Sequence, residues 1–302
     1  MDRAMDRTTS GWINGLLGVL IFSGSLPATR LAMGGFDPLY LTAARAAIAG
    51  GLALLMLAAL RQPRPALSDI VPLLVVAGGV VLGFPLLSAM ALRHIDTAHS
   101  IMFTGLLPLA TAIFAVLRGG ERPAPAFWLF AALGSAAVTG FALRDGAGTA
   151  SMGDALMLAA ILVCGLGYAE GAVLARRLGG WQVICWALVL ALPAMIGLMT
   201  ALPAPRWTQV PSAAWAGLAY VALFSMLIGF VFWYRGLALG GIASVGQLQL
   251  LQPLCGLALA AILIDEPIGG SIVAITIVVA ICVAAARHFA KRRPALCPAR
   301  SS

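Results

Sequence analysis

The sequence predicts an all-α polytopic membrane protein with ten transmembrane helices, arranged as two inverted five-helix repeats. Its composition, a series of long apolar segments and a similarity between its two halves support this prediction. Of the 302 residues, 61% are hydrophobic and only 10% are charged, and the mean hydropathy is +0.99. Soluble domains are about 45–50% apolar and about 25% charged. A soluble chain of this composition could not cover its own core, so we expect a membrane protein.

The apolar residues are gathered in ten segments. A membrane-spanning helix needs about 20 apolar residues, because a rise of about 1.5 Å per residue must cross about 30 Å of hydrocarbon. The segments that meet this requirement are 11–31, 38–60, 69–91, 97–117, 124–143, 153–175, 182–202, 212–234, 243–264 and 268–290. Long apolar runs favour helices over the alternating strands of a barrel. We expect the first segment to be a retained span rather than a signal peptide, because two aspartates balance the two arginines before it.

The net charge of +8 is distributed as in a membrane protein with both termini in the cytoplasm. With a cytoplasmic N-terminus, 14 of the 19 lysines and arginines fall in inside segments, and Arg45 falls within the second helix. The remaining four, in outside segments, are Arg30, Arg93, Arg144 and Arg206. The positive-inside rule favours this orientation, and a basic tail at 293–302 is expected near anionic head groups. The charge pattern therefore gives no reason to expect a nucleic-acid partner.

The two halves of the chain align with an offset of 145 residues. The offset pairs Pro108 with Pro253 and Glu121 with Glu266. Each half holds five predicted helices, and because five is odd the halves must insert in opposite orientations, as in many secondary transporters. We expect a first repeat at 1–145, a second repeat at 146–292 and the tail after it, with Glu121 in the cytoplasm and Glu266 outside.

Together these features resemble the EamA-type members of the drug/metabolite transporter superfamily, over nearly the whole chain. The shared features are ten helices, two inverted halves, and a proline and a glutamate separated by twelve residues at the close of the fourth and ninth helices. Arg45 in TAARAAIAGG occupies the place of an arginine typical of the family. The FSGS at 22–25 departs from the family's Trp-Gly-Ser-like opening. The resemblance implies an exporter in the bacterial inner membrane, similar to exporters of aromatic and other amino acids.

The stretch RHIDTAHS at 93–100 contains two histidines and an aspartate, which raises the question of a metal site. Zinc needs three or four protein ligands in most sites, and the aligned LGGIAS of the second half supplies none. We therefore expect no metal. The simpler expectation is that Asp96 or Thr97 caps the fourth helix and that His94 lies in the outer connector. His99 remains a candidate for the exit path.

A central cavity between the halves is expected to bind the substrate. Gln249 and Gln252 share one face of the ninth helix, and Thr104 aligns with Gln249 at the offset between the halves. These polar side chains either line the cavity or, alternatively, contribute to packing between helices. Aromatic side chains near mid-depth are expected to form an apolar wall, while others face lipid. The candidate substrate-binding residues are Ser25, Phe84, His99, Phe103, Thr104, Tyr168, Glu170, Phe224, Gln249 and Gln252.

Two charged residues lie within predicted spans and need separate explanations. Glu170 is the only carboxylate well inside a span, where an isolated charge costs about 2.5–3.5 kcal/mol. It is a candidate for a contact to a substrate ammonium or for a proton carrier; the alternatives are a structural pair with an arginine or a side chain that reaches towards Arg177. Arg45 is a candidate for binding a substrate carboxylate or, alternatively, for bracing helices through backbone carbonyls.

Helix-breaking residues predict places where helices bend. A proline frees a backbone carbonyl and kinks the helix, and kinks at matched positions would let half-helices move during alternating access. Static kinks that shape the bundle are the alternative. The candidate hinge residues are Gly24, Pro27, Pro85, Pro108 and Pro253.

The leading functional hypothesis is a secondary transporter of small amphiphilic metabolites, facilitative or proton-linked. The chain lacks a phosphate-binding glycine loop, so direct use of ATP is not expected. We expect no cofactor, a small-molecule substrate, the lipid bilayer as surroundings and a monomer. Multidrug or nucleoside- or sugar-type transport are alternatives within the same superfamily. An intramembrane enzyme or a receptor-like bundle would be alternatives of another class, and an enzyme would need a nucleophile–base pair at shared depth.

Overall fold

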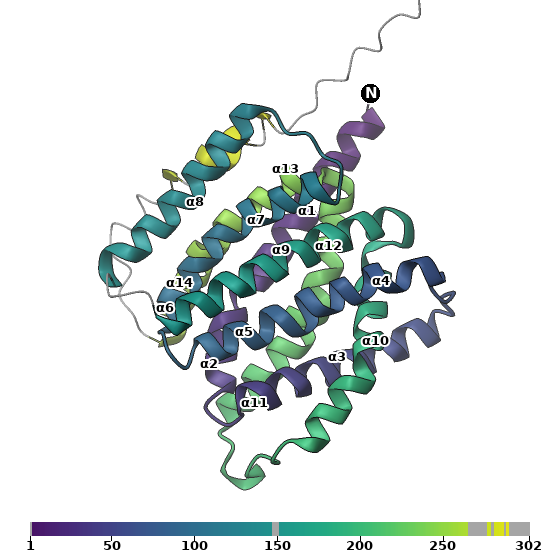
Figure 1. Ribbon diagram of the computed structural model, residues 1–302, viewed down its shortest axis with the longest axis vertical. Coiled ribbons are helices and arrows are strands. Elements are labelled where there is room, and N and C mark those ends of the chain that lie inside the picture. Colours follow the sequence, from purple (N-terminus) through teal and green to yellow (C-terminus); the bar gives the residue numbers. More distant parts are fainter. Residues whose placement is uncertain (1, 147–150, 265–276, 279–280, 287, 290–302) are drawn as a thin grey trace, which may run out of the picture.

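The computed structural model describes residues 2–146, 151–264, 277–278, 281–286 and 288–289 (Figure 1). These residues are helical or in turns and loops, with no strand among them, which confirms the all-α prediction. Within them, seven helical segments are long and apolar enough to cross a membrane: Arg7–Ala32, Pro38–Ala59, Leu67–Ala91, His99–Leu117, Met152–Leu178, Gly180–Ala201 and Ser212–Gly240. The number ten stays a prediction, because most of the expected tenth helix at 268–290, and Glu266 before it, lie outside the described residues.

The helices follow one another through short connectors. In the first half they are α1 (Asp2–Ser23), α2 (Ser25–Ala32), α3 (Pro38–Ala59), α4 (Leu67–Val76), η1 (Ala77–Gly83), α5 (Phe84–Ala91), α6 (Thr97–Phe103), η2 (Thr104–Leu106), α7 (Leu107–Leu117) and α8 (Pro125–Gly146). In the second half they are α9 (Met152–Leu178), α10 (Gly180–Ala201), η3 (Trp207–Gln209), α11 (Ser212–Ala219), η4 (Tyr220–Ile228), α12 (Gly229–Gly240), α13 (Ile242–Gly246), η5 (Gln247–Leu251) and α14 (Gln252–Ile264).

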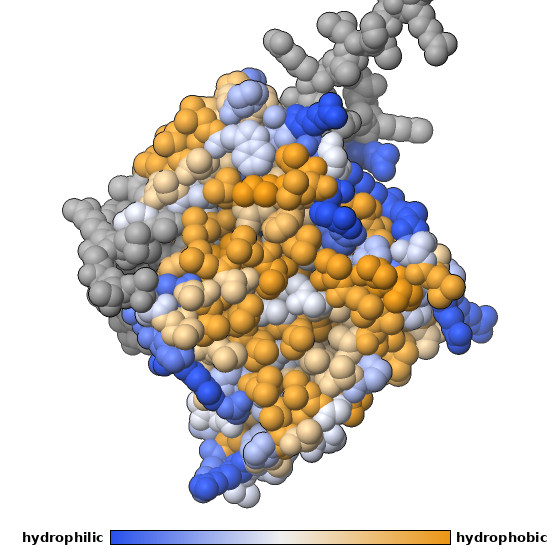
Figure 2. All heavy atoms as spheres, viewed as in Figure 1, coloured by the Kyte–Doolittle hydropathy of each residue, from blue (hydrophilic) through white to orange (hydrophobic). Residues whose placement is uncertain are grey.

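On the face drawn in Figure 2, polar residues gather at two ends of the bundle and an apolar band lies between them. At one end, here named the Glu121 end, helices α3, α7, α9 and α12 terminate. At the other, here named the Asp37 end, α3, α6 and α9 begin. In Figure 1 the Glu121 end lies to the upper right and the Asp37 end to the lower left. An apolar belt between two polar rims is the surface that a bilayer requires.

Side-chain caps explain where several helices begin. Asp37 accepts a hydrogen bond from the backbone N–H of Leu39 at 2.9 Å, and Pro38 occupies the first turn of α3. Asp96 accepts from the N–H of His99 at 2.7 Å, which confirms the predicted cap of the fourth helix. Ser151 and Asp154 form a reciprocal capping box at the start of α9.

Irregular turns interrupt several of the membrane-spanning segments. A break at Gly24 separates α1 from α2, and the hydroxyl of Tyr220 donates to the carbonyl of Ile21 at 2.7 Å, one turn before the break. The segments η1 and η4 are π-helical, whereas η2 and η5 are 3₁₀-helical. Adding the offset of 145 to 77–83 and 104–106 gives 222–228 and 249–251, which fall within η4 and η5. The same irregularity therefore recurs at the same place in both halves.

Close contacts between helices depend on glycine. Helix α1 packs along α12, where a Cβ added to Gly236 would lie 2.6 Å from the backbone nitrogen of Gly15. Helix α9 lies among α4, α5 and α7, and α3 packs along α10. These contacts bring α1, α2, α3, α9 and α12 around the centre of the bundle, where the cavity described next is found.

Candidate functional site

A small chamber lies in the interior of the bundle, between helices of both halves. Its volume is about 20 Å³, which leaves room for about one water molecule. The residues that line it are Phe22, Ser25, Leu26, Arg45, Val80, Phe84, Pro85, Cys164, Tyr168, Ser225, Phe230 and Gln252. They come from helices of the first half and of the second half in nearly equal share, so a relative movement of the halves would change its size.

The polar side of the chamber is built around Arg45. This side chain is 5% exposed, and its Nη2 donates to the hydroxyl of Ser225 at 3.2 Å. The hydroxyls of Ser225 and Ser25 are 2.7 Å apart and share a hydrogen bond that joins η4 to α2. Within the described part of the chain, the Nε of Arg45 has no hydrogen-bond partner and no carboxylate pairs with the guanidinium. The Oε1 of Gln252 is likewise buried without a donor.

Another part of the chamber wall is aromatic. The ring of Phe22 lies 4.9 Å from that of Phe230 and 6.3 Å from that of Tyr168, and Tyr168 meets Phe230 edge-on at 5.9 Å. Trp233 is fully buried behind Tyr168, with ring centres 5.3 Å apart. Such contacts lie in the range that aromatic pairs prefer, so the wall is a packed apolar surface.

The structure brings part of the predicted set to the chamber. Among the candidates, those in its wall are Ser25, Arg45, Phe84, Pro85, Tyr168 and Gln252. Phe103, Thr104 and Gln249 are buried elsewhere in the bundle, and both amide atoms of Gln249 lack a described partner. Phe224 is 45% exposed and stacks on Tyr220, so it lies on the outer surface of the bundle.

His99 lies at the Asp37 end rather than at the chamber. Its Nε2 is 3.0 Å from Oδ1 of Asp154, and this pair links the start of α6 to the start of α9. Arg93 pairs with Asp37 nearby, and Arg30 donates to the carbonyl of Leu92 at 2.7 Å. No group of three or more metal-ligating side chains occurs among the described residues.

Ion pairs join the two halves at the Glu121 end. Glu170 accepts from Nε of Arg118 at 2.7 Å and from Nη2 at 3.1 Å, a two-pronged pair that corresponds to the structural alternative stated for Glu170. The carboxylate raises the pKa of Arg118 by hydrogen bonding and by charge attraction. Asp69, which is buried, pairs with Arg177. Both pairs connect the first half to the second.

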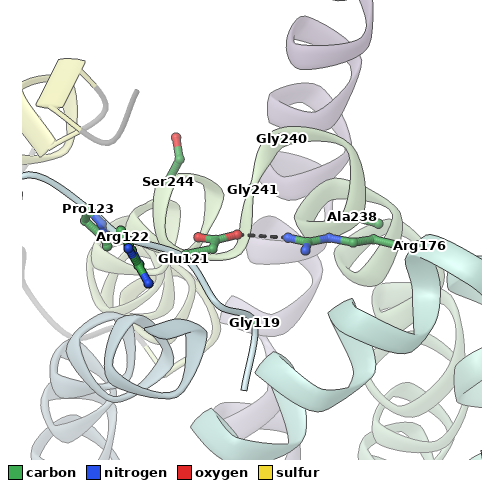
Figure 3. A pocket seen from close by; sticks show the side chains of 9 residues that line it. All are labelled: Gly119, Glu121, Arg122, Pro123, Arg176, Ala238, Gly240, Gly241 and Ser244. Atoms are coloured by element: carbon green, nitrogen blue, oxygen red, sulfur yellow. Dashed lines mark hydrogen bonds and ion pairs between the residues drawn. The ribbon is translucent and has the colours of Figure 1, made fainter. Parts of the chain in front are cut away.

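Glu121 makes a third connection at this end (Figure 3). Its Oε1 accepts from Nη2 of Arg176 at 2.9 Å and from the N–H of Ile242 at 2.8 Å, and its Oε2 accepts from the N–H of Ala243 at 2.8 Å. The backbone turns sharply at Gly241, whose φ of 92° favours glycine, so that the first N–H groups of α13 point at the carboxylate. A cavity of about 380 Å³ surrounds this contact.

Several residues of the site were not among the predicted candidates. Ser225 has a weak sequence signal, because it is a polar residue inside the apolar segment 212–234. Phe22 and Phe230 lie in apolar segments where a lipid-facing aromatic looks the same in the sequence. The pairing of Arg118 with Glu170 joins residues 52 positions apart and has no local signal.

A multi-pass helical bundle with an enclosed polar and aromatic chamber between its halves has the architecture of a membrane transporter. The EamA-like transporter family matches residues 9–143 and 151–286, so the chain belongs to this family and carries two of its domains. Transport of a small molecule follows from this membership, and the intramembrane enzyme considered above is excluded by it.

Two relatives and one solved structure extend the comparison. The chain is 64% identical over 287 residues to the "Uncharacterized transporter YdeK" of Bacillus subtilis, covering 95% of this chain and all of that protein. It is 24% identical over 255 residues to the "Probable terminal-alkyne amino-acid exporter" of Streptantibioticus cattleyicolor, covering 83% and 84% of the two chains. A crystal structure matches with a TM-score of 0.74 at 20% identity, over 93% of this chain and 98% of that chain, and shows the shared fold.

Proposed function

We propose that the protein exports small amphiphilic metabolites, with amino acids as the substrate class, across the bacterial inner membrane by alternating access between two inverted repeats. The observation that carries the proposal is the chamber between the halves, which combines an aromatic wall with a buried arginine and a buried glutamine, each of which has one polar atom without a partner among the described residues. A substrate with polar and apolar parts matches this mixture. The distant relative named as an amino-acid exporter supports the substrate class.

The ion pairs at the Glu121 end support a conformation that is closed on that side. Glu170–Arg118, Asp69–Arg177 and the contacts of Glu121 all cross from one half to the other. In the proposed cycle they break when the Glu121 end, which we assign to the cytoplasm, opens to admit substrate. In each pair the arginine is partly exposed, whereas Glu170 and Asp69 are buried. Opening of this end must therefore bring water to the two carboxylates, which would solvate them once their arginines move away.

Counterflow in proteoliposomes tests the proposal. Vesicles containing the purified protein are loaded with an unlabelled amino acid, nucleoside or cationic drug, and the entry of the same labelled compound is followed. We expect counterflow of hydrophobic or aromatic amino acids and none in protein-free vesicles. An imposed pH gradient separates proton-linked accumulation from equilibration. If nucleosides or cationic drugs showed counterflow and amino acids did not, the proposed substrate class would be wrong. If no compound showed counterflow, the proposal as a whole would be contradicted.

A further inference from the structure

Arg45 is a buried charge that pairs with no opposite charge among the residues that the structure describes. It lies seven residues after Pro38, so about 10 Å from the start of α3 at 1.5 Å per residue. Its guanidinium carries five N–H donors, yet the contact found among the described residues is one neutral hydroxyl, that of Ser225. Ionisable residues within membrane spans are rare, face the bundle interior or a water-filled cavity, pair with other groups there, and mark substrate pathways.

The missing partner has a defined chemistry. A guanidinium presents parallel N–H groups that fit the two oxygens of a carboxylate. In the described part of the chain no carboxylate pairs with Arg45, since Glu170 and Asp69 are held by other arginines. The unpartnered Nε belongs to a side chain in the wall of the chamber, so a carboxylate carried by the substrate would complete the pair.

Gln252 provides a second polar group of opposite character. Its Oε1 is buried, accepts no hydrogen bond from the described residues, and belongs to the same chamber wall. An amide oxygen accepts from an ammonium N–H without adding another buried charge. The chamber therefore offers a cation for an anionic group, an acceptor for a cationic group and an aromatic wall for an apolar side chain.

We infer that the chamber recognises zwitterionic α-amino acids, with Arg45 binding the carboxylate, Gln252 accepting from the ammonium group, and the side chain lying against Phe22, Tyr168 and Phe230. This inference rests on the proposed function and specifies its substrate site. A cation without a carboxylate is disfavoured, because it would share the chamber with the unpaired charge of Arg45. An uncharged apolar compound is disfavoured as well, because it would leave both polar groups unsatisfied.

Binding requires the chamber to expand beyond about 20 Å³. The contact that would give way is the hydrogen bond of 2.7 Å between Ser25 and Ser225. The hydroxyl of Ser225 could then donate to the substrate carboxylate beside Arg45. Loss of the serine contact would remove a hydrogen bond between α2 and η4, and would thereby couple recognition of the carboxylate to movement between the halves.

The test uses phenylalanine and three analogues in proteoliposomes with the wild-type protein. Phenylalaninamide and phenethylamine lack the carboxylate, and 3-phenylpropionate lacks the ammonium group. Each unlabelled compound competes with labelled phenylalanine in counterflow. We expect all three analogues to compete about 10- to 100-fold more weakly than phenylalanine, the effect of losing a hydrogen bond to a charged group.

Two variants assign the groups. Arg45→Gln should reduce phenylalanine counterflow and remove the preference over phenylalaninamide, and Gln252→Leu should remove the preference over 3-phenylpropionate. Arg93→Gln, at the Asp37 end, is the control and should leave both preferences unchanged. Because Arg45→Gln could fail to fold, the wild-type analogue series stands by itself. If phenylalaninamide competed as well as phenylalanine, the inference would be overturned, but amino-acid export would stand. If neither phenylalanine nor any other amino acid showed counterflow, the proposed function itself would be rejected.

Discussion

At the scale of single residues, the pair formed by Glu170 and Arg118 is unequal. The Glu170 side chain is 6% exposed, whereas that of Arg118 is 52% exposed. Removal of Arg118 leaves a buried carboxylate without its two donors, while removal of the charge on Glu170 leaves a guanidinium that water can solvate. We expect Arg118→Ala to destabilise the protein by about 1–3 kcal/mol, and Glu170→Gln by less.

Thermal unfolding of the purified protein in detergent measures the difference. The double variant should unfold near the temperature of Glu170→Gln, because the buried charge is then absent. Arg122→Ala, exposed in the same connector, is the control for loss of a positive charge. Equal effects of Arg118→Ala and Glu170→Gln would contradict the unequal burial of the pair.

The depth of Glu170 could be predicted from hydropathy, but its partner could not. The sequence places a carboxylate over two turns inside a span, which requires either a partner or a functional role. Arg118 lies 52 residues away, at the end of another helix, and only the packing of α7 against α9 brings the two together. Arg45 is the converse case, because its depth was equally predictable and no carboxylate in the described part of the chain pairs with it.

At the scale of elements, two adjacent glycines in η1 differ in their surroundings. A Cβ added to Gly79 would overlap the carbonyl oxygen of Val163 and lie 3.1 Å from the Cα of Gly167 in α9. A Cβ added to Gly78 meets nothing within 4 Å. We expect Gly79→Ala to destabilise by about 1–3 kcal/mol through overpacking, and Gly78→Ala to be neutral or stabilising by about 0.4–1 kcal/mol.

Unfolding temperatures of the two variants, each compared with the wild type, test this expectation. Both substitutions add one methyl group to the same π-helical segment, so intrinsic helix preference cancels between them. A Gly78→Ala variant as destabilised as Gly79→Ala would show that the segment, rather than its contact with α9, is sensitive to a side chain.

The positions of helix interruptions were only partly predictable. Pro108 and Pro253 indicated breaks in the fourth and ninth helices, and the 3₁₀ turns η2 and η5 directly precede the helices that contain them. The π-helical segment η1 likewise directly precedes the helix that contains Pro85, a candidate hinge residue. The segment η4 had no such signal, because a shift in hydrogen-bond register within an apolar run changes no residue type. A hinge function for these breaks stays a prediction.

At the scale of the whole molecule, the arginines whose side chains the structure describes gather at the Glu121 end, apart from Arg45 in the interior. Those near this end are Arg7, Arg61, Arg64, Arg118, Arg122, Arg176, Arg177 and Arg235, against Arg30, Arg93 and Arg206 near the Asp37 end. Hydropathy and the charge pattern could therefore predict both the apolar band and its asymmetry. The chamber could not be predicted in the same detail, because its wall combines side chains from nine helical segments.

The asymmetry predicts that the Glu121 end faces the cytoplasm. In a background where the five cysteines are replaced, His94→Cys and Arg122→Cys place single thiols in exposed connectors at opposite ends. A membrane-impermeant maleimide applied to intact cells should label position 94 and leave position 122 unlabelled until the membrane is permeabilised. The reverse pattern would place the ion pairs of Glu121 and Glu170 on the outer side of the membrane. The closed end of the bundle would then face outwards. One span, at 97–117, is expected between the two connectors, so labelling of both positions in intact cells would contradict the predicted topology.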